Sequence, residues 1–258
     1  MTILVQGCLF DDNKSDAVQL NALDTATANV TVSNCTLQRT SQGNEGFAFA
    51  NAESGHLTVH IVNNSSTGIG GVVAFVGNTA ANASSSSLLT AVVSSNTITH
   101  PATALNSAII AFPSSTTGQV ASASITIDHN TVTENSTNGV SRGIFVDTPD
   151  NNTTPSFTAN VTNNTVSVTD NIAGLQGIGL QARRGTGCFK VQNNTVTFPN
   201  GAPAGVVGIR VRQAAPGVAN LEQGSSSGTA ATVLAANNPG ATTEIIGTVN
   251  VVANGTCP

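Results

Sequence analysis

The fold can be predicted from the sequence SITIDHNTVT at residues 124–133, which is followed after a loop by GIFVD at residues 143–147. Apolar and polar side chains alternate through both stretches, and the alternation breaks once, at Asn130. Alternation with a period of two is typical of β-strands, whose successive side chains point to opposite faces. The segment therefore predicts two short strands that meet at a tight corner, and a third strand after a loop.

The same unit recurs along the chain at intervals of 27 to 44 residues when each copy is aligned by its corner residue. The corner residues are Cys8, Cys35, Asn64, Asn96, Asn130, Asn164, Asn194 and Asn238. Repeats of this length are typical of solenoids, in which each copy packs on its neighbours. Asparagine suits such a corner because it tolerates the left-handed backbone conformation, and stacked amides can hydrogen-bond from copy to copy.

The alignment also predicts which side chains fill the interior. Around the corner, three positions are apolar in every copy except at Ser66 and Gly240, and the last copy places Val233 and Ala235 in its first strand. In the third strand the expected inward pairs are Val18 and Leu20, Phe47 and Phe49, Val73 and Phe75, Ile110 and Phe112, Ile144 and Val146, Ile178 and Leu180, Ile209 and Val211, and Val249 and Val251. A slip by one residue would exchange the two faces of a strand, so these apolar columns support the register.

Three short strands per copy predict an all-β chain, folded as a right-handed, single-stranded parallel β-helix of about eight coils. We expect one domain over residues 1–258, with a long loop at 214–230 because that segment is rich in Gly, Ser and Pro. An asparagine ladder is expected along the corner, at Asn64, Asn96, Asn130, Asn164 and Asn194.

The corner motifs resemble those of right-handed parallel β-helix proteins of the pectate-lyase-like superfamily. They read Asn130-Thr131-Val132-Thr133, Asn164-Thr165-Val166-Ser167 and Asn194-Thr195-Val196-Thr197. The chain is also similar to the β-helix passenger regions of bacterial autotransporters and large repeat adhesins. The resemblance implies a fold over nearly the whole chain, but a fold of this kind hosts many activities.

The amino-acid composition argues against nucleic acid as a partner and against a membrane-spanning segment. The net charge is −5 and only 8% of residues are charged, so nucleic acid is not expected as a partner, since phosphate binding needs clustered basic side chains. No run of 18 apolar residues occurs, so no membrane-spanning segment is predicted. Met1 leads directly into the first strand without a signal peptide, and we expect it to mark the boundary of a longer or processed chain.

The four cysteines suggest an oxidising compartment. Cys8 and Cys35 occupy the same corner position in adjacent coils, so their Cα atoms are expected about 4.8 Å apart, a separation that a disulfide allows. The alternative is that both are thiols standing in for asparagine. A second disulfide, between Cys188 and Cys257, would fasten the C-terminal tail. We expect a secreted or cell-surface protein, of bacterial origin by the resemblance to autotransporters.

Catalysis in the resembled fold uses aspartates on the outer face of the third strand, or calcium held by aspartates beside a basic residue. The outward positions of that strand hold one carboxylate here, whereas glycoside hydrolysis needs two. We therefore expect no enzyme and no cofactor, with a polysaccharide lyase or hydrolase, and Ca²⁺, as the alternatives. The weak catalytic candidates are Asp147, Asp150, Arg183 and Arg212, and the candidate ligand-binding residues are Gln181, Arg184 and Arg210. This group predicts either an anionic-sugar site or a solvated network of surface ion pairs.

Two further surfaces are predicted. Hydroxyl side chains form a double file after the corner, at Thr97, Thr99, Thr131, Thr133, Thr165, Thr195 and Thr197, with Ser65, Thr67 and Ser167. Such a grid resembles the binding face of β-solenoid ice-binding proteins, although threonine is also simply a good strand residue. On the third strand a mildly apolar exposed strip is expected, formed by Ala48, Ala50, Ala74, Val76, Ala111, Pro113 and Phe145.

From these features we expect a structural or adhesive module that binds a glycan or a cell surface. Affinity would come from repetition along a stiff rod rather than from one deep pocket. End-to-end or lateral association of rods is a further expectation, because solenoid ends and flat sheet faces recruit other strands.

Overall fold

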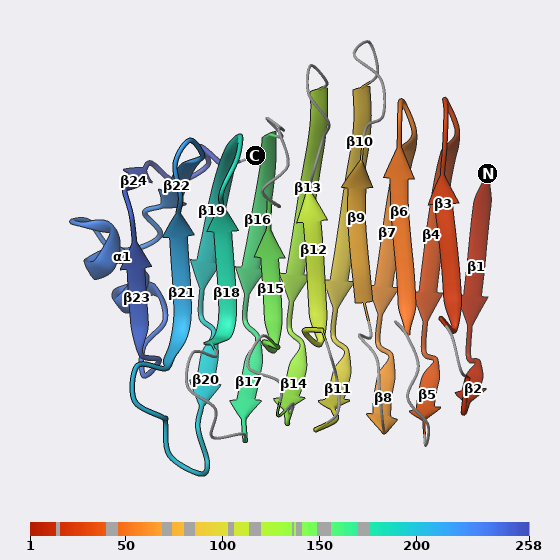
Figure 1. Ribbon diagram of the computed structural model, residues 1–258, viewed down its shortest axis with the longest axis horizontal. Helices are drawn as coiled ribbons and strands as arrows, with labels where there is room; N and C mark the ends of the chain where they lie inside the picture. The colour runs from red at the N-terminus through yellow and green to blue at the C-terminus, as the bar shows by residue number, and fades with distance from the viewer. Residues whose placement is uncertain are drawn as a thin grey trace.

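The computed structural model describes residues 1–13, 16–39, 46–68, 74–79, 86–102, 106–113, 120–135, 137, 141–148, 156–169 and 176–257. Within them the chain is a parallel β-solenoid of three sheets that run along its length, as predicted (Figure 1). The N-terminal coil lies at one end of the solenoid, and helix α1 (Ala230–Asn237) lies at the other. Every described strand pairs in parallel with its neighbours in the sheet, which belong to adjacent coils.

The first sheet, here called sheet A, contains nine strands: β1 (Thr2–Gln6), β4 (Thr27–Ser33), β7 (His56–Val62), β10 (Ser86–Ser94), β13 (Val120–Asp128), β16 (Ser156–Thr162), β19 (Thr186–Gln192), β22 (Val218–Glu222) and β24 (Val249–Val252). Sheet B contains seven: β2 (Leu9–Asp11), β5 (Thr36–Arg39), β8 (Ser65–Gly68), β11 (Thr97–His100), β14 (Thr131–Glu134), β17 (Thr165–Val168) and β20 (Thr195–Thr197). Sheet C contains eight: β3 (Val18–Ala22), β6 (Phe47–Ala52), β9 (Ala74–Thr79), β12 (Ile109–Pro113), β15 (Ile144–Asp147), β18 (Gln176–Ala182), β21 (Val207–Gln213) and β23 (Thr243–Ile246). The described part of the chain thus makes fewer complete turns than the eight expected.

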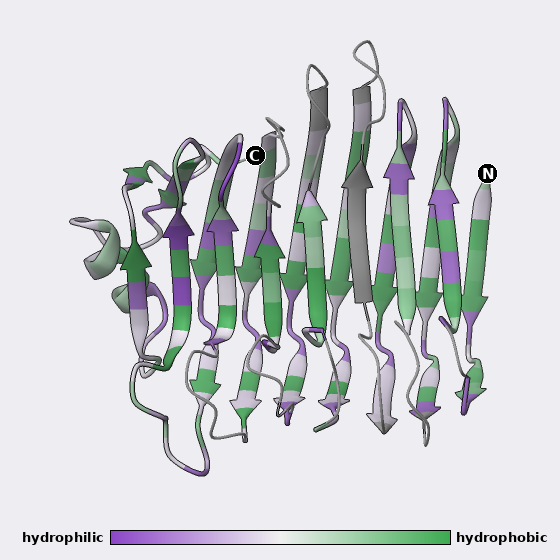
Figure 2. Cartoon of the chain, in the orientation of Figure 1, coloured by the Kyte–Doolittle hydropathy of each residue, from purple (hydrophilic) through white to green (hydrophobic). Residues whose placement is uncertain are grey.

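The interior is filled by one continuous apolar column, and the alternation that encodes it is visible along the strands in Figure 2. Ile125, Ile127 and Val161 are at most 1% exposed, and Ile127 pairs with Val161 as the register requires. Gly187 lies opposite Phe157, whose ring packs edge-on against Phe189 at 5.5 Å. A Cβ atom at Gly187 would lie 2.5 Å from the Phe157 ring, so glycine is the residue that leaves room for this aromatic pair.

The corner between sheets A and B carries the predicted asparagine ladder. Each ladder asparagine after Asn64 accepts two hydrogen bonds at its Oδ1, from the backbone N–H and the Nδ2 of the ladder residue one coil earlier, at 2.9–3.1 Å. The Oδ1 of Asn64 accepts from the backbone N–H of Cys35. Its own Nδ2 donates to a strand carbonyl of the coil before, as Asn130 does to Val93. Because these amides are buried, the ladder satisfies polar groups that water cannot reach.

The left-handed bend lies one residue before the ladder position, which corrects the expectation that the asparagine itself adopts this conformation. Positive φ angles of 54–58° occur at Asn34, Asn63, Ser95, His129, Asn163 and Asn193. The bend and the ladder are formed by two successive residues for a physical reason. The left-handed residue turns the chain, and the side chain of the next residue can then point inward along the axis.

The two corner cysteines are free thiols rather than the disulfide that geometry allows. Cys35 Sγ accepts a hydrogen bond from the backbone N–H of Cys8 at 3.4 Å, which is the role of Oδ1 elsewhere in the ladder. It also donates to the carbonyls of Ser33 and Val5, as an asparagine Nδ2 would. The thiols therefore extend the ladder by two weaker members, and burial raises the pKa of Cys35.

The register predicted for sheet C is wrong by one residue in two successive coils. Ile109 and Ala111, not Ile110 and Phe112, align with the inward pair Ile144 and Val146. In the coil before, Val76, not Phe75, aligns with Phe49 and Ala111, and Val73 lies outside the described residues. Adjacent isoleucines fit either register, and loops of unequal length leave no fixed corner to choose between them. Ile110, Phe112 and Phe145 consequently form an apolar cluster on the outer side. The expected exposed strip is not exposed at Ala48, Ala111, Pro113 and Phe145, which are buried.

The last coil also differs from the prediction. Segment 214–230, expected to be a loop, contains β22, whose Leu221 pairs with Phe189 in the interior column. Val233 and Ala235 belong to helix α1, and Val249 and Val251 belong to β24 of sheet A instead of sheet C. The strand was missed because apolar and polar residues alternate only weakly in Val218-Ala219-Asn220-Leu221. The Gly, Ser and Pro residues around it then favoured the prediction of a loop. Asn238 nevertheless joins the ladder, from the C-terminal end of α1.

Candidate functional site

Sheet C brings most of the predicted binding residues together on its outer side. Along one file Gly179 of β18 is the neighbour of Arg210 of β21, which is the neighbour of Glu244 of β23. Along the next file the neighbours are Asp147, Gln181 and Arg212. We call this surface the arginine face; it comprises Arg142, Arg183, Arg210 and Arg212 with Asp147, Gln176, Gln181 and Glu244.

Asp147 is held as an ion-pair partner, not as a free acid. Its side chain is 2% exposed, and its two oxygens accept from Nε and from a terminal nitrogen of Arg183, with Nε at 2.9 Å from Oδ1. The turn after β18 is fixed by the hydroxyl of Thr148, which accepts from the backbone N–H groups of Arg183 and Arg184 at 2.8 and 3.1 Å. Asp150, the second carboxylate candidate, lies outside the described residues.

Arg142 lies at the centre of the arginine face, although the sequence did not single it out. Its guanidinium carbon lies 4.0 Å from the centre of the Phe145 ring, and its Nε donates to Gln176 Oε1 at 2.6 Å. The side chain crosses Gly179, where a Cβ atom would lie 2.8 Å from Arg142 Cδ. Glycine at position 179 therefore makes room for the arginine, and the aromatic ring beneath adds a cation–π contact.

Burial of Arg142 lowers its pKa to about 10. The charge of Asp147 opposes this change, and the positive charges of Arg210, Arg183 and Arg212 reinforce it. Arg142 stays protonated near neutral pH, but in an environment where its charge is poorly solvated and repelled by its neighbours.

The remaining arginines differ in how they are engaged. Arg210 Nε donates to Glu244 in a half-exposed ion pair. Arg212 is exposed and donates to Gln181 Oε1 at 3.4 Å, a long hydrogen bond. Arg184 is not among the charges that shift the pKa of Arg142, and its buried Nε has no hydrogen-bond partner among the described residues. The structure thus brings together Asp147, Gln181, Arg183, Arg210 and Arg212 from the predicted set.

The residues that sequence reasoning missed here are Arg142, Gln176 and Glu244. A signal for the first two exists in the repeated pair Gly143-Ile144, Gly177-Ile178 and Gly208-Ile209, which marks the start of the strand in three successive coils. Glycine is needed there, since a Cβ atom at Gly143 would lie 2.5 Å from a methyl group of Val166. In the first two of these coils, the residue just before the glycine, Arg142 or Gln176, has a side chain that reaches the arginine face.

A buried pair of a histidine and a glutamate inside the solenoid was also missed. His100 Nδ1 lies 2.8 Å from Glu134 Oε2, and both side chains are fully buried at the ends of β11 and β14. His100 Nε2 has no hydrogen-bond partner among the described residues. The inward position of these two residues follows from the strand pattern, since Ile98 and Val132 two residues earlier also point inward.

The predicted threonine grid is present on the outer side of sheet B. Register places Ser65, Thr97, Thr131, Thr165 and Thr195 in one file across five strands. A second file contains Thr99, Thr133, Ser167 and Thr197. Strand spacing of about 4.8 Å sets the repeat along the solenoid axis.

The predicted disulfide between Cys188 and Cys257 is present, with sulfur atoms 2.02 Å apart and Cα atoms 5.3 Å apart. It ties the C-terminal tail to β19. Within the described residues no group of three His, Cys, Asp or Glu side chains is placed to hold a metal ion. No helix in this part of the chain is long and apolar enough to span a membrane.

Comparison with known proteins adds no relative: no family model, curated protein or solved structure matches this chain.

Proposed function

We propose that this protein is a secreted or surface-displayed adhesive β-solenoid that binds acidic polysaccharide through the arginine face. The observation that carries the proposal is the partly buried guanidinium of Arg142 together with the positive charges of three further arginines near it, in a chain whose net charge is −5. Only Asp147 and Glu244 oppose these four positive charges among the described residues of this face.

The energetic argument rests on charge repulsion within the arginine face. Arg142 loses solvation by burial and is repelled by Arg210, Arg183 and Arg212, as its lowered pKa records. A carboxylate or sulfate group placed among them would offset both effects, and guanidinium groups bind such anions in a bidentate way. The face extends over β15, β18, β21 and β23, about 14 Å at the usual strand spacing, which suits an oligosaccharide better than a single ion.

Binding without cleavage is favoured by the state of the carboxylates. Asp147 is engaged by Arg183, and Glu244 by Arg210, so neither is poised as a general acid or nucleophile. A lyase or hydrolase like those of the pectate-lyase-like superfamily remains the runner-up, with Asp150 as its second carboxylate. Its signature would be release of reducing ends or unsaturated sugars from a polyuronate.

The test compares a charge-depleted face with a matched control. The double variant Arg210→Gln/Arg212→Gln should bind polygalacturonate with a dissociation constant raised at least about tenfold, as measured by isothermal titration calorimetry. Lys190→Gln removes a positive charge on sheet A and should leave the affinity unchanged. Added salt should weaken binding by the wild type. Equal affinity of the double variant, or equal binding of neutral dextran, would contradict the proposal.

A second function is favoured by the register of sheet B. Hydroxyl and methyl groups repeat there at every strand, and most of the first file is exposed, which is the geometry of a lattice-matching surface such as an ice-binding face. Thr131→Tyr should abolish thermal hysteresis if this surface binds ice. Thr126→Tyr, on the outer side of sheet A, is the control. Absence of hysteresis in the wild type would leave the threonines as strand formers only.

A further inference from the structure

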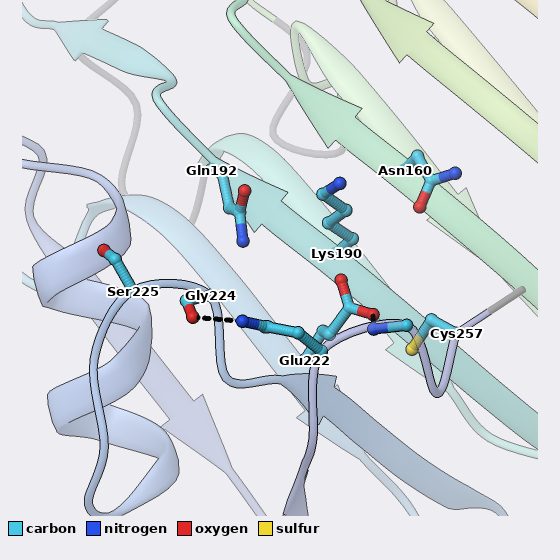
Figure 3. A pocket seen from close by; sticks show the side chains of 9 residues that line it. Asn160, Lys190, Gln192, Glu222, Gly224, Ser225 and Cys257 are labelled. Carbon is cyan, nitrogen blue, oxygen red and sulfur yellow. Dashed lines mark hydrogen bonds between the residues drawn. The ribbon is translucent and has the colours of Figure 1, made fainter.

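A polar cleft of about 560 Å³ lies on the outer side of sheet A near its C-terminal end, away from the arginine face (Figure 3). Asn160 of β16 and Lys190 of β19 are register neighbours. Glu222 of β22 directly follows Leu221, which pairs with Phe189, the residue before Lys190. Gln192 of β19 and the loop residues Gly224 and Ser225 complete one side. The opposite wall is the C-terminal tail, residues 254–257.

The tail is fixed against the sheet at several points. Glu222 Oε1 accepts from the backbone N–H of Gly255 at 2.5 Å, and Asn254 Nδ2 donates to the carbonyl of Gly224 at 2.6 Å. The disulfide then anchors Cys257 to Cys188, which lies on β19 two residues before Lys190. The wall is therefore covalently attached to the strand that supplies the basic side chain of the cleft.

The polar groups of the cleft have hydrogen-bonding capacity to spare. Asn160 Oδ1 is buried and has no hydrogen-bond partner in the part of the chain that the structure describes. Lys190 forms no ion pair with the described residues, and its side chain stands between Gln192 and Asn160 in Figure 3. A buried acceptor without a donor is unfavourable, so a ligand that donates there would be stabilised.

We infer that this cleft binds a small neutral polyhydroxylated molecule, of the size of a mono- or disaccharide. One ammonium and one carboxylate, from Lys190 and Glu222, balance in charge, so the cleft selects for neither anions nor cations. Hydroxyl groups both donate and accept, which matches a lining that offers Asn160 Oδ1, a lysine, a carboxylate and a glutamine amide. The lining contains no aromatic or aliphatic side chain, which disfavours apolar ligands. The volume lies within the range usual for small-molecule sites.

The same geometry makes binding depend on the disulfide. Reduction of Cys188–Cys257 releases the tail, which supplies one wall, while the stacked coils that supply the other remain paired through their backbones. Ligand affinity should therefore fall on reduction although the solenoid stays folded.

The experiment uses the intact oxidised protein with maltose, cellobiose and trehalose as neutral probes, and with a galacturonate disaccharide and glucosamine as charged comparators. ¹H–¹⁵N spectra should show saturable shifts confined to Lys190, Gln192 and residues 254–257 for at least one neutral probe. Asn160→Leu and Lys190→Ala should each weaken that binding about tenfold or more. Arg210→Gln/Arg212→Gln should leave it unchanged, which separates this site from the arginine face.

The reduction arm uses the double variant Cys188→Ser/Cys257→Ser, whose circular dichroism reports that the solenoid is retained. Lost binding with an unchanged spectrum supports the proposal, and unchanged affinity overturns the role of the tail. Tighter binding of either charged comparator overturns the ligand class. An absence of shifts with all three neutral probes overturns the site itself.

Discussion

The corner between sheets A and B and the outer side of sheet C are built on opposite principles. At the corner, a left-handed residue and a buried ladder residue recur in successive coils, and each coil bonds to the next through the same three hydrogen bonds. On sheet C the strands enter and leave through loops of unequal length, and the outer files change from apolar to charged along the axis. The first region sets the spacing of the coils. The second uses that spacing to place arginines from different coils side by side.

Structural stability and ligand binding are thus assigned to different regions of the molecule, the corner and the outer side of sheet C. A ladder amide has all its partners fixed and little exposure, so substitution there should act on stability alone. A sheet C side chain such as Arg212 is exposed and loosely held, so substitution there should act on binding alone. The predictions that follow test this separation.

The largest effect is expected for Asn130→Ala in the middle of the ladder. The change leaves the buried backbone N–H of Asn96 without its acceptor and removes one donor from the carbonyl of Val93, so the free energy of unfolding should fall by about 2–4 kcal/mol. Urea denaturation followed by circular dichroism measures it. The control is Asn250→Ala, which removes an exposed amide pair with Asn220 and should change stability by no more than about 0.5 kcal/mol. Similar losses for both variants would refute a special role for the corner.

The next effect concerns Asp147→Asn on sheet C. Arg183 would lose its carboxylate in a site where Asp147 is almost fully buried, and stability should fall by about 2 kcal/mol. At the same time the arginine face gains net positive charge, so affinity for polygalacturonate should rise. Glu244→Gln, in the more exposed pair with Arg210, should cost less than about 1 kcal/mol. A fall in affinity for Asp147→Asn would mean that this carboxylate contacts the ligand directly.

A pH effect is expected at the solvent side of the corner, where Asp128 joins two coils. Partial burial works to raise its pKa, but hydrogen bonds from Thr162, His129 and Asn163 outweigh it, so the pKa is lowered overall. A carboxyl group with a lowered folded-state pKa stabilises the protein above its unfolded pKa of about 3.9, and this contribution disappears as the pH falls through the folded pKa. Melting temperatures of the wild type and Asp128→Asn should therefore differ near neutral pH and converge in acid. A constant difference would contradict this assignment.

The smallest effect is a gain. Cys35→Asn replaces a weak sulfur acceptor with an amide oxygen for the backbone N–H of Cys8 and supplies a better donor to the carbonyl of Val5. Stability should rise by roughly 0.5–1 kcal/mol, the usual net value of a hydrogen bond. Cys35→Ala, which removes both roles, should lower it. If Cys35→Asn destabilised the protein, the first coils would not follow the geometry of the ladder.

The same contrast between the two regions explains what the sequence could predict. The corner repeats a fixed pair of residues, so sheets A and B were aligned correctly from the first coil through the seventh, and the ladder was found up to Asn238 in α1. Sheet C has no such fixed point. With adjacent Ile109 and Ile110, the pattern permitted two registers, and only the packing of Ile109 against the interior decides between them.

The candidate site could likewise be predicted only where the strands of sheet C follow the repeat. Asp147, Gln181, Arg210 and Arg212 were placed together because β15, β18 and β21 obey the repeat. Arg142 was missed because its side chain reaches the site from the start of a strand, across a glycine of the next coil. Glu244 was missed because Val249 and Val251 offered an equally good strand. Neither contact is encoded in local alternation.

The ladder amides are oriented alike from Asn64 to Asn238. From Asn96 onward the side-chain carbonyl points toward the preceding coil, and from Asn64 to Asn194 one amide hydrogen points toward the following coil, so the carbonyl dipoles of the stacked amides add along the axis. The positive end of this row is the Nδ2 of Asn238, and it donates to the carbonyl of Leu234 in the last turn of α1. A helix carries partial negative charge at that end. The C-terminal end of the short helix therefore brings its partial negative charge to the positive end of the amide row.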